Sequence, residues 1–143
     1  MKTIRRSAQG FTLIEMMLVV VIMGILMTIA VVKFSGLTEK SKITATRADI
    51  TQYGTALKLY ELDNGFFPTT DQGLAALKQK PAGAQEPLHW KEGGYLDTPL
   101  RDDQWGHPYI YKYPGERNPG NYDLYSAGPN GVPGDADDIA NWQ

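Results

Sequence analysis

The sequence predicts an α+β fold in which a long N-terminal helix carries a small antiparallel β-sheet head. All nine prolines lie at or after Pro68, and proline interrupts helix interiors, so a long helix should precede a loop-rich unit. Two aromatic-rich segments, 109–113 and 122–126, are typical of β-strands. The turn-forming residues 114–121 between them predict an antiparallel hairpin.

The first half of the predicted helix is apolar on every face. From Phe11 to Val32 the one formal charge is Glu15, and these 22 residues extend roughly 33 Å in a helix. The hydrocarbon core of a bilayer is about 30 Å thick, so we predict a transmembrane and assembly helix over residues 11–34. Basic residues at positions 2, 5 and 6 predict a cytoplasmic N-terminus and an exported remainder.

The second half of the helix, predicted over residues 37–63, is amphipathic. Its apolar side chains form a seven-residue repeat with two tyrosines in between: Ile43, Ile50, Leu57, Tyr53 and Tyr60. This spacing places them on one face of a helix. The repeat is too short for a sustained coiled coil, so we expect it to pack on the chain's own globular part. Asp63-Asn64-Gly65 should end the helix.

The exported head is predicted to include residues 35–143. After the helix, residues 64–107 form an αβ loop that contains a short capped helix beginning near Thr69. The hairpin occupies residues 108–126, and an acidic tail loop follows over residues 127–138. A chain of 143 residues suggests a single domain outside the span.

Composition argues against several functions. There is no cysteine, and from residue 34 onward ten Lys and Arg stand against fifteen Asp and Glu. An acidic domain lacks the basic patches that nucleic-acid binding requires. His89 and His107 have no metal-ligand spacing and no serine nucleophile close in the sequence, so we expect surface or hydrogen-bonding roles for both. The sequence predicts that the protein is not an enzyme.

Chemistry alone leaves three interpretations of the N-terminus. A secretory signal peptide would have a shorter apolar run and a better cleavage site than the one near Ala30. An ordinary membrane anchor leaves Glu15 unexplained, because a carboxylate at the centre of a bilayer costs roughly 3 kcal/mol on insertion scales. The third interpretation is a cleaved leader, and it comes from a resemblance.

The segment Gly10-Phe11-Thr12-Leu13-Ile14-Glu15 follows a short basic leader and resembles the junction of type IV prepilins and type II secretion pseudopilins. The resemblance implies that a prepilin peptidase removes residues 1–10 by cutting after Gly10, and then methylates the amine of Phe11. It also implies that Glu15 pairs with the Phe11 amine of a neighbouring subunit. Such a pair offsets much of the cost of burying a carboxylate and sets the register between subunits.

One position departs from that family pattern. Many members have a proline where this chain has Val32, and a proline there opens a kink in the helix. Without that proline, Gly24 is the remaining weak point of the predicted span.

The acidic tail is the second candidate site. Calcium takes about six to eight oxygen ligands, and a Gly- and Pro-rich turn exposes backbone carbonyls. Four side chains of the tail supply further oxygens: Asn130, Asp135, Asp137 and Asp138. The loop is not an EF-hand, because predicted helices do not flank it and the terminal glutamate is missing. The residues alone leave both an exposed acidic turn and a calcium loop open.

The head also resembles the major pseudopilins of type II secretion, which belong to the type IV pilin-like superfamily. The matching segments are residues 60–65, 67–77, 93–96, 103–106, 122–128 and 137–142. The resemblance implies one calcium ion, held by the backbone oxygens of Ala127 and Val132 and by the side chains of Asn130, Asp137 and Asp138. The family commonly has aspartate at position 130, so asparagine predicts weaker affinity unless Asp135 compensates.

The resemblance implies a structural function. The chain would be the core subunit of a type II secretion pseudopilus, a periplasmic filament that drives folded proteins across the outer membrane. Implied partners are identical subunits, minor pseudopilins, the prepilin peptidase and an inner-membrane assembly platform. Before assembly the subunit would cross the inner membrane once, with its N-terminus cytoplasmic and its head periplasmic.

Two alternatives to this function remain. A type IV pilin of a surface filament is one, although many such pilins carry a disulfide near the C-terminus and this chain has no cysteine. A calcium-dependent binding module on an ordinary membrane anchor is the other.

Overall fold

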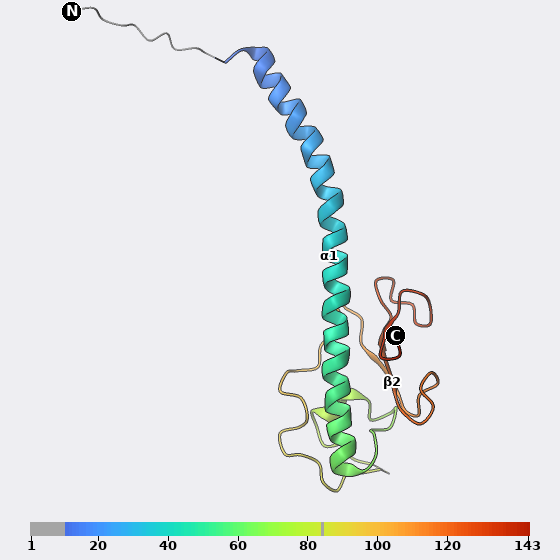
Figure 1. The fold of residues 1–143 in the computed structure, drawn as a ribbon. Coiled ribbons are helices and arrows are strands. Elements are labelled where there is room, and N and C mark those ends of the chain that lie inside the picture. The colour runs from blue at the N-terminus through green and yellow to red at the C-terminus, as the bar shows by residue number, and fades with distance from the viewer. Residues whose placement is uncertain (1–10, 84) are drawn as a thin grey trace, which may run out of the picture. The chain divides into compact units, whose positions relative to one another are not determined.

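The structure, a computed structural model, describes residues 11–83 and 85–143, without the side chains of residues 29–36. Five elements follow one another in this part of the chain (Figure 1): α1 (Leu13–Asn64), the 3-10 turn η1 (Leu74–Leu77), β1 (Ile110–Lys112), β2 (Asp123–Ser126) and β3 (Ile139–Ala140). The chain forms two compact units, Met1–Glu39 and Lys40–Gln143. A helix together with a small antiparallel sheet confirms the predicted α+β class.

The helix α1 is continuous over 52 residues. Its backbone remains helical at Gly24 and at Val32, since neither removes a backbone hydrogen-bond donor as proline would. It ends at Asn64, and Gly65 follows with a positive φ of 82° that suits a glycine at the end of a helix. Within the part of the chain that is described, no helical segment is long and apolar enough to cross a membrane.

The sheet has the strand order β1-β2-β3, and both pairings are antiparallel. In the β1–β2 hairpin, Tyr111 lies opposite Leu124 and Lys112 lies opposite Asp123, which confirms the hairpin predicted from the aromatic segments. The third strand was not predicted. It pairs Ile139 with Ser126 and is only two residues long, so no alternating pattern in the sequence could reveal it.

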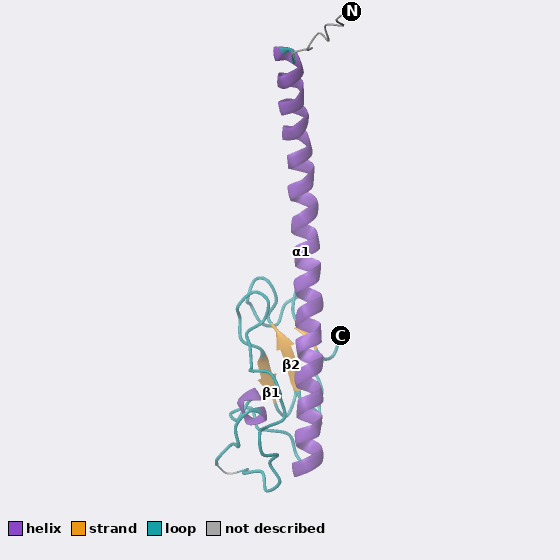
Figure 2. Cartoon of the chain, turned by 90° about the vertical axis from the view of Figure 1, so that its left-hand side faces the viewer, coloured by secondary structure: helices purple, strands orange, loops and turns teal. Residues whose placement is uncertain are grey.

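Within the unit Lys40–Gln143, the sheet lies along one side of α1 (Figure 2). Four residues of the predicted stripe are buried there, namely Ile50, Tyr53, Leu57 and Tyr60, and Ile43 is partly buried against the same core. Thr46 and Ala56, which the stripe did not include, are buried on α1 as well. Leu57 and Tyr60 are 0% exposed, as are Leu77 of η1 and Leu124 of β2. The interpretation that the stripe packs on the chain's own head is therefore confirmed.

Aromatic rings join α1 to the rest of the head. The ring centroids of Tyr53 and Tyr109 are 5.2 Å apart, and those of Tyr60 and Tyr95 are 5.3 Å apart. The Tyr53–Tyr109 pair is edge-to-face and the Tyr60–Tyr95 pair is tilted. Aromatic pairs contribute about 0.5–1.5 kcal/mol beyond the area that they bury. Tyr53 and Tyr60, the two tyrosines of the predicted stripe, therefore pack in the core.

In place of the short capped helix predicted after Thr69, the chain has a hydrogen-bonded turn at Thr69 and Gln72 and then a 3-10 turn with no side-chain cap of its own. The backbone N–H of Thr69 donates to Gln72 Oε1 (3.0 Å), and the N–H of Gln72 donates back to Thr69 Oγ1 (3.3 Å). This reciprocal pair is a capping box. The helical residues that follow, Leu74–Leu77, form one 3-10 turn and not an α-helix.

We expect Tyr60→Phe to stabilise the head. The Tyr60 hydroxyl is buried and has no hydrogen-bond partner among the described residues, and an unpaired buried hydroxyl costs about 1–3 kcal/mol. Urea unfolding of the detergent-solubilised chain at pH 7 should give a free energy of unfolding up to about 1 kcal/mol higher than that of the wild type. As a control, Tyr111→Phe should be destabilising, because its hydroxyl donates to the Pro68 carbonyl at 2.8 Å.

The stability advantage of Tyr60→Phe over the wild type should be larger at alkaline pH. Burial, and then the nearby Tyr95, raise the pKa of Tyr60 from 10.0 to about 12. A raised pKa in the folded state means stability that is present below pH 10 and is lost as the pH rises toward 12. Tyr60→Phe lacks that loss, so its advantage should be larger at pH 11 than at pH 7. A variant that is less stable than the wild type at both pH values would contradict this account.

Candidate functional site

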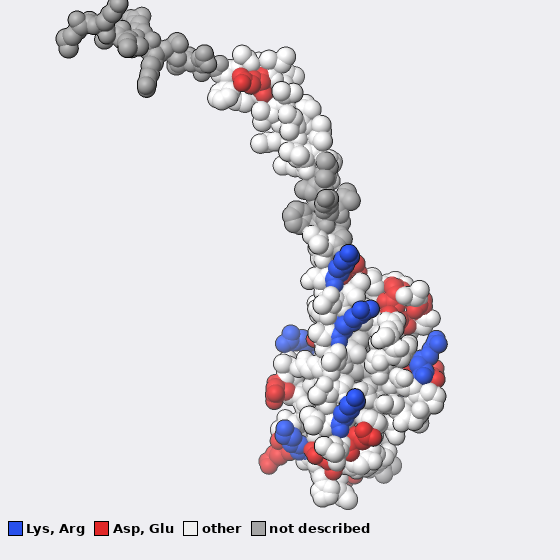
Figure 3. Space-filling view, in the orientation of Figure 1, with Lys and Arg blue, Asp and Glu red and all other residues white. Residues whose placement is uncertain are grey.

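The predicted assembly end lies in the first unit. Gly10, the predicted cut site, is outside the described residues, whereas Phe11 is described and its residue is 76% exposed. The apolar side chains from Phe11 to Met27 are exposed in the single chain, and Figure 3 shows this described stretch almost free of charge. A surface of this kind requires a cover of lipid or of other apolar side chains.

Glu15 has a partner within its own helix. Its Oε2 accepts a hydrogen bond from the Thr12 N–H, and its own N–H donates to Thr12 Oγ1, both at 3.3 Å. Thr12 and Glu15 therefore form a capping box at the start of α1. The sequence contains the pattern of a capping box, a threonine followed three residues later by a glutamate. This role was not predicted, because Glu15 was interpreted only as an inter-subunit partner. The pairing with a neighbour's Phe11 amine stays a prediction.

The tail loop is held at both ends by the sheet. Ala127 follows β2 directly and Asp138 precedes β3 directly, and these two strands pair with each other. Both residues are buried, with exposed fractions of 3% and 8%. The strand β3 thus brings the two ends of the predicted calcium loop together, although its sequence gave no signal of a strand.

Asn130 lies at the centre of the loop. Its Nδ2 donates to Asp135 Oδ2 (2.7 Å) and to Asp137 Oδ1 (3.0 Å), and its Oδ1 accepts from the Val132 N–H (2.7 Å). One amide therefore gathers two carboxylates and fixes the turn of the chain between them. Asp135, which the resemblance did not include, belongs to the same group.

The pKa values of the Asp135 and Asp137 carboxyl groups shift in opposite directions. A hydrogen bond from the Asp137 side chain lowers the pKa of Asp135, and the same bond raises the pKa of Asp137. The cause is that two adjacent negative charges repel, so one carboxyl retains its proton more strongly. A cation at this place would relieve the same repulsion.

Asp138 has one satisfied oxygen and one unsatisfied oxygen. Its Oδ2 accepts from the Gly134 N–H at 2.8 Å, whereas the buried Oδ1 has no hydrogen-bond partner among the described residues. Burying a carboxylate oxygen without a donor or a cation is costly. Over the described part of the chain, no three His, Asp or Glu side chains converge as a metal cluster. The predicted calcium set has only two carboxylates and takes its other oxygens from an amide and the backbone.

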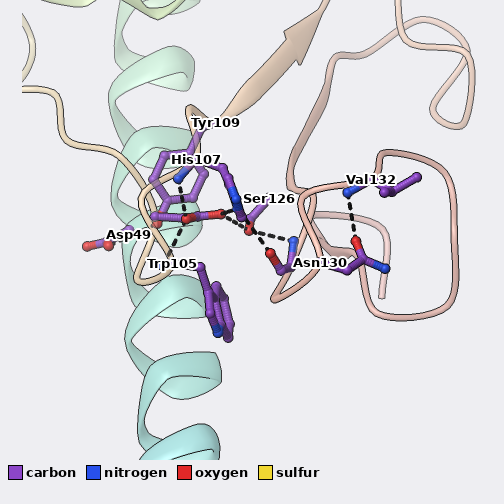
Figure 4. A network of polar contacts seen from close by, with 9 residues as sticks. Asp49, Trp105, His107, Tyr109, Ser126, Asn130 and Val132 are labelled. Atoms are coloured by element: carbon purple, nitrogen blue, oxygen red, sulfur yellow. Dashed lines mark hydrogen bonds and ion pairs between the residues drawn. The ribbon is translucent and has the colours of Figure 1, made fainter.

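A polar cluster that the sequence did not predict adjoins the loop (Figure 4). Asp103 Oδ2 accepts the hydroxyl hydrogen of Ser126, and His107 Nδ1 lies 3.2 Å from the Gly128 carbonyl oxygen. The expectation of a hydrogen-bonding role for His107 therefore agrees with its surroundings. Ser126 donates to a carboxylate and not to the imidazole, so the cluster lacks the nucleophile–base pair of a serine hydrolase.

Comparison with known proteins finds a matching family model for the N-terminal segment and another for the rest of the chain. The family described as type II secretion system protein G matches residues 33–142, and the prokaryotic N-terminal methylation motif matches residues 5–31. The chain is 45% identical to the type II secretion system core protein G of Pseudomonas aeruginosa, over 96% of this chain and 97% of that protein. It is 43% identical to the core protein G of Vibrio cholerae, over 99% of this chain and 96% of that protein.

A solved structure is similar as well. The crystal structure of the major pseudopilin from the type 2 secretion system of enterohaemorrhagic Escherichia coli is 38% identical in sequence, with a TM-score of 0.68. The match covers 75% of this chain and 87% of that one.

We expect the close packing of the loop's two ends to make Gly128→Ala destabilising. Gly128 has φ 64°, and a Cβ built there would collide with the carbonyl oxygen of Asp137. Gly65→Ala is the matched control, because Gly65 also has positive φ but nothing lies within 4 Å of its Cβ position. Thermal unfolding should show Gly128→Ala to be roughly 1–3 kcal/mol less stable than the control, the usual effect of overpacking. Equal losses in the two variants would mean that the two ends do not pack closely.

Proposed function

The chain belongs to the protein G family of type II secretion systems, and we propose that it polymerises from the inner membrane into a periplasmic pseudopilus. Its function is that of a structural core subunit of the pseudopilus, and it is not an enzyme. The observation that carries the proposal is the pair of adjoining matches, an N-terminal methylation motif over residues 5–31 and protein G over residues 33–142. The alternatives of a surface pilin and of an anchored binding module are set aside.

The proposal assigns a place to each part of the chain. Residues 1–10 are a leader that a prepilin peptidase removes, and residues 11–34 anchor the subunit once in the inner membrane. The head lies in the periplasm and contacts identical subunits and minor pseudopilins. The exposed apolar side chains from Phe11 to Met27, among which Glu15 is the one charge, support this, since both lipid and neighbouring helices can cover them. The inner-membrane assembly platform would supply the site at which subunits join the filament.

Glu15 acts in two states under this proposal. In the single subunit, its carboxylate accepts from the Thr12 N–H and caps α1. In the filament, it pairs with the amine that cleavage creates on Phe11 of a neighbour. A carboxylate that is first bonded within its own helix avoids full exposure to hydrocarbon before that partner is available.

Two substitutions at Glu15 separate the cap from the ion pair. Glu15→Ala removes both contacts, whereas Glu15→Gln retains an oxygen that can accept from the Thr12 N–H but removes the charge. Both variants should be cleaved and methylated, as mass spectrometry of the membrane-extracted subunit would report. Neither should form filaments visible by electron microscopy. Normal filaments from Glu15→Gln would refute the ion pair and leave the helix cap as the role of Glu15.

We also propose that the tail loop binds one calcium ion. The ligands would be the backbone oxygens of Ala127 and Val132 and the side chains of Asn130, Asp137 and Asp138. The residues fit the ion on two observations: Asp138 Oδ1 is buried without a hydrogen-bond partner among the described residues, and the Asp135 and Asp137 carboxylates both lie against the Asn130 amide. When bound, the cation would neutralise this acidic group and link the two ends of the loop, in a head that has no disulfide.

Calcium should therefore stabilise the chain. Binding to the folded state alone adds about 2.7 kcal/mol at one hundred times the dissociation constant, so the melting temperature should rise by several degrees and fall again with a chelator. Asp138→Asn should abolish most of the rise, and Asp97→Asn, an exposed aspartate in the αβ loop, should not. Asp135→Asn tests whether Asp135 compensates for Asn130. A wild-type melting temperature that ignores calcium would rule out the site.

A further inference from the structure

A buried carboxylate organises the turn on which the tail loop rests. Asp103 is 5% exposed, and its Oδ1 accepts the backbone N–H groups of Trp105 (3.0 Å) and His107 (2.8 Å). The Asp103 N–H donates to the His107 carbonyl at 2.8 Å, which closes the turn over residues 103–107. Its Oδ2 accepts the hydroxyl of Ser126 at the end of β2. Asp103 thus joins two segments that are 23 residues apart in sequence.

Ser126, which Asp103 holds in place, also fixes the first peptide of the loop. Its Oγ accepts the Gly128 N–H at 3.1 Å while its own hydrogen is donated to Asp103. The Gly128 N–H and the Ala127 carbonyl belong to one planar trans peptide, so the two groups point in opposite directions. A hydrogen bond that fixes the N–H therefore also fixes the direction of the Ala127 carbonyl, which is one of the proposed ligands.

His107 constrains the next peptide. Because a carbonyl oxygen can only accept, the nitrogen Nδ1 carries the hydrogen in its 3.2 Å contact with the Gly128 carbonyl. The imidazole also fills the space under the turn, since a Cβ built on Gly131 would lie 2.7 Å from Nε2. The Gly131 N–H closes the turn to the Gly128 carbonyl at 3.4 Å. Gly131 immediately precedes Val132, the second proposed backbone ligand.

We propose that Asp103, Ser126 and His107 are positioning residues that hold the calcium loop in its binding conformation before the ion arrives. The inference rests on the proposed calcium site and adds to it three side chains that are not among its ligands. A loop that is already ordered loses less conformational freedom when it binds, so its affinity is higher. Residues that orient metal ligands in this way typically change affinity by about 10- to 100-fold when they are replaced.

The test is calcium titration by isothermal calorimetry on the full-length chain in detergent micelles. His107→Ala should weaken calcium binding about tenfold, although every proposed ligand remains. His107→Asn should restore affinity to within about threefold, because an amide N–H can replace the Nδ1 donor toward the Gly128 carbonyl. His89→Ala, at an exposed histidine of the αβ loop, is the matched control and should bind as the wild type does.

Ser126→Ala and Asp103→Asn test the two buried members. Each should weaken calcium binding at least as much as His107→Ala, with the fold checked by circular dichroism and by the melting temperature in chelator. The His107 series remains decisive if either buried variant fails to fold, because the His107 side chain is 36% exposed and its loss disturbs the core less.

The possible outcomes distinguish failure of the calcium site from failure of the positioning role. Wild-type protein that binds no calcium overturns the site, and this inference with it. Wild type that binds calcium, with His107→Ala equally tight, overturns the positioning role alone. A variant that melts lower in chelator but has an unchanged dissociation constant also overturns it, because His107 would then stabilise the fold without orienting the loop. An Asn variant as weak as the Ala variant overturns the hydrogen bond as the contact responsible.

Discussion

The head depends on the burial of one face of α1 against the sheet. The sheet consists of three strands with two to four residues each, and strands this short are not stable alone in water. Leu57 and Tyr60 of α1 and Leu124 of β2 belong to one buried hydrophobic cluster, and all three are 0% exposed. With no disulfide to close the chain, this contact is what positions every later segment.

The packing of α1 against the sheet also determines the position of the tail loop. The β2 strand carries Leu124 into the core, and two residues later it carries Ser126 to the Asp103 carboxylate. The antiparallel pairing of β2 with β3 then returns the chain, so the loop begins and ends at the same end of these two strands. The cation that we propose for this loop would link two ends that strand pairing already holds together.

Among the described residues, acidic groups that lack a positive partner occur both near the start of α1 and in the tail loop. At the start of α1, a carboxylate in apolar surroundings accepts a hydrogen bond from the backbone N–H of Thr12, and the proposed cleavage would create an amine one residue before Thr12. In the tail, the Asp135 and Asp137 carboxylates lie close together around the Asn130 amide, and Asp138 Oδ1 has no hydrogen-bond partner among the described residues. In both places, leaving the acidic group without a positive partner costs free energy in the single subunit. Pairing with the proposed amine or cation would offset that cost.

The sequence by itself determined the features that depend on near neighbours in the chain. The seven-residue stripe of α1, the aromatic hairpin and the junction before Glu15 are local patterns of spacing and residue type, and each identified its element or its family. Tertiary structure decided what depends on contacts between distant residues. Ile139 and Ala140 form a strand only because β2 offers an edge, and Asp103 matters only because folding brings Ser126 to it. Such roles leave no periodic signal, since burial and hydrogen bonding across 23 residues are properties of the packed chain and not of any segment of it.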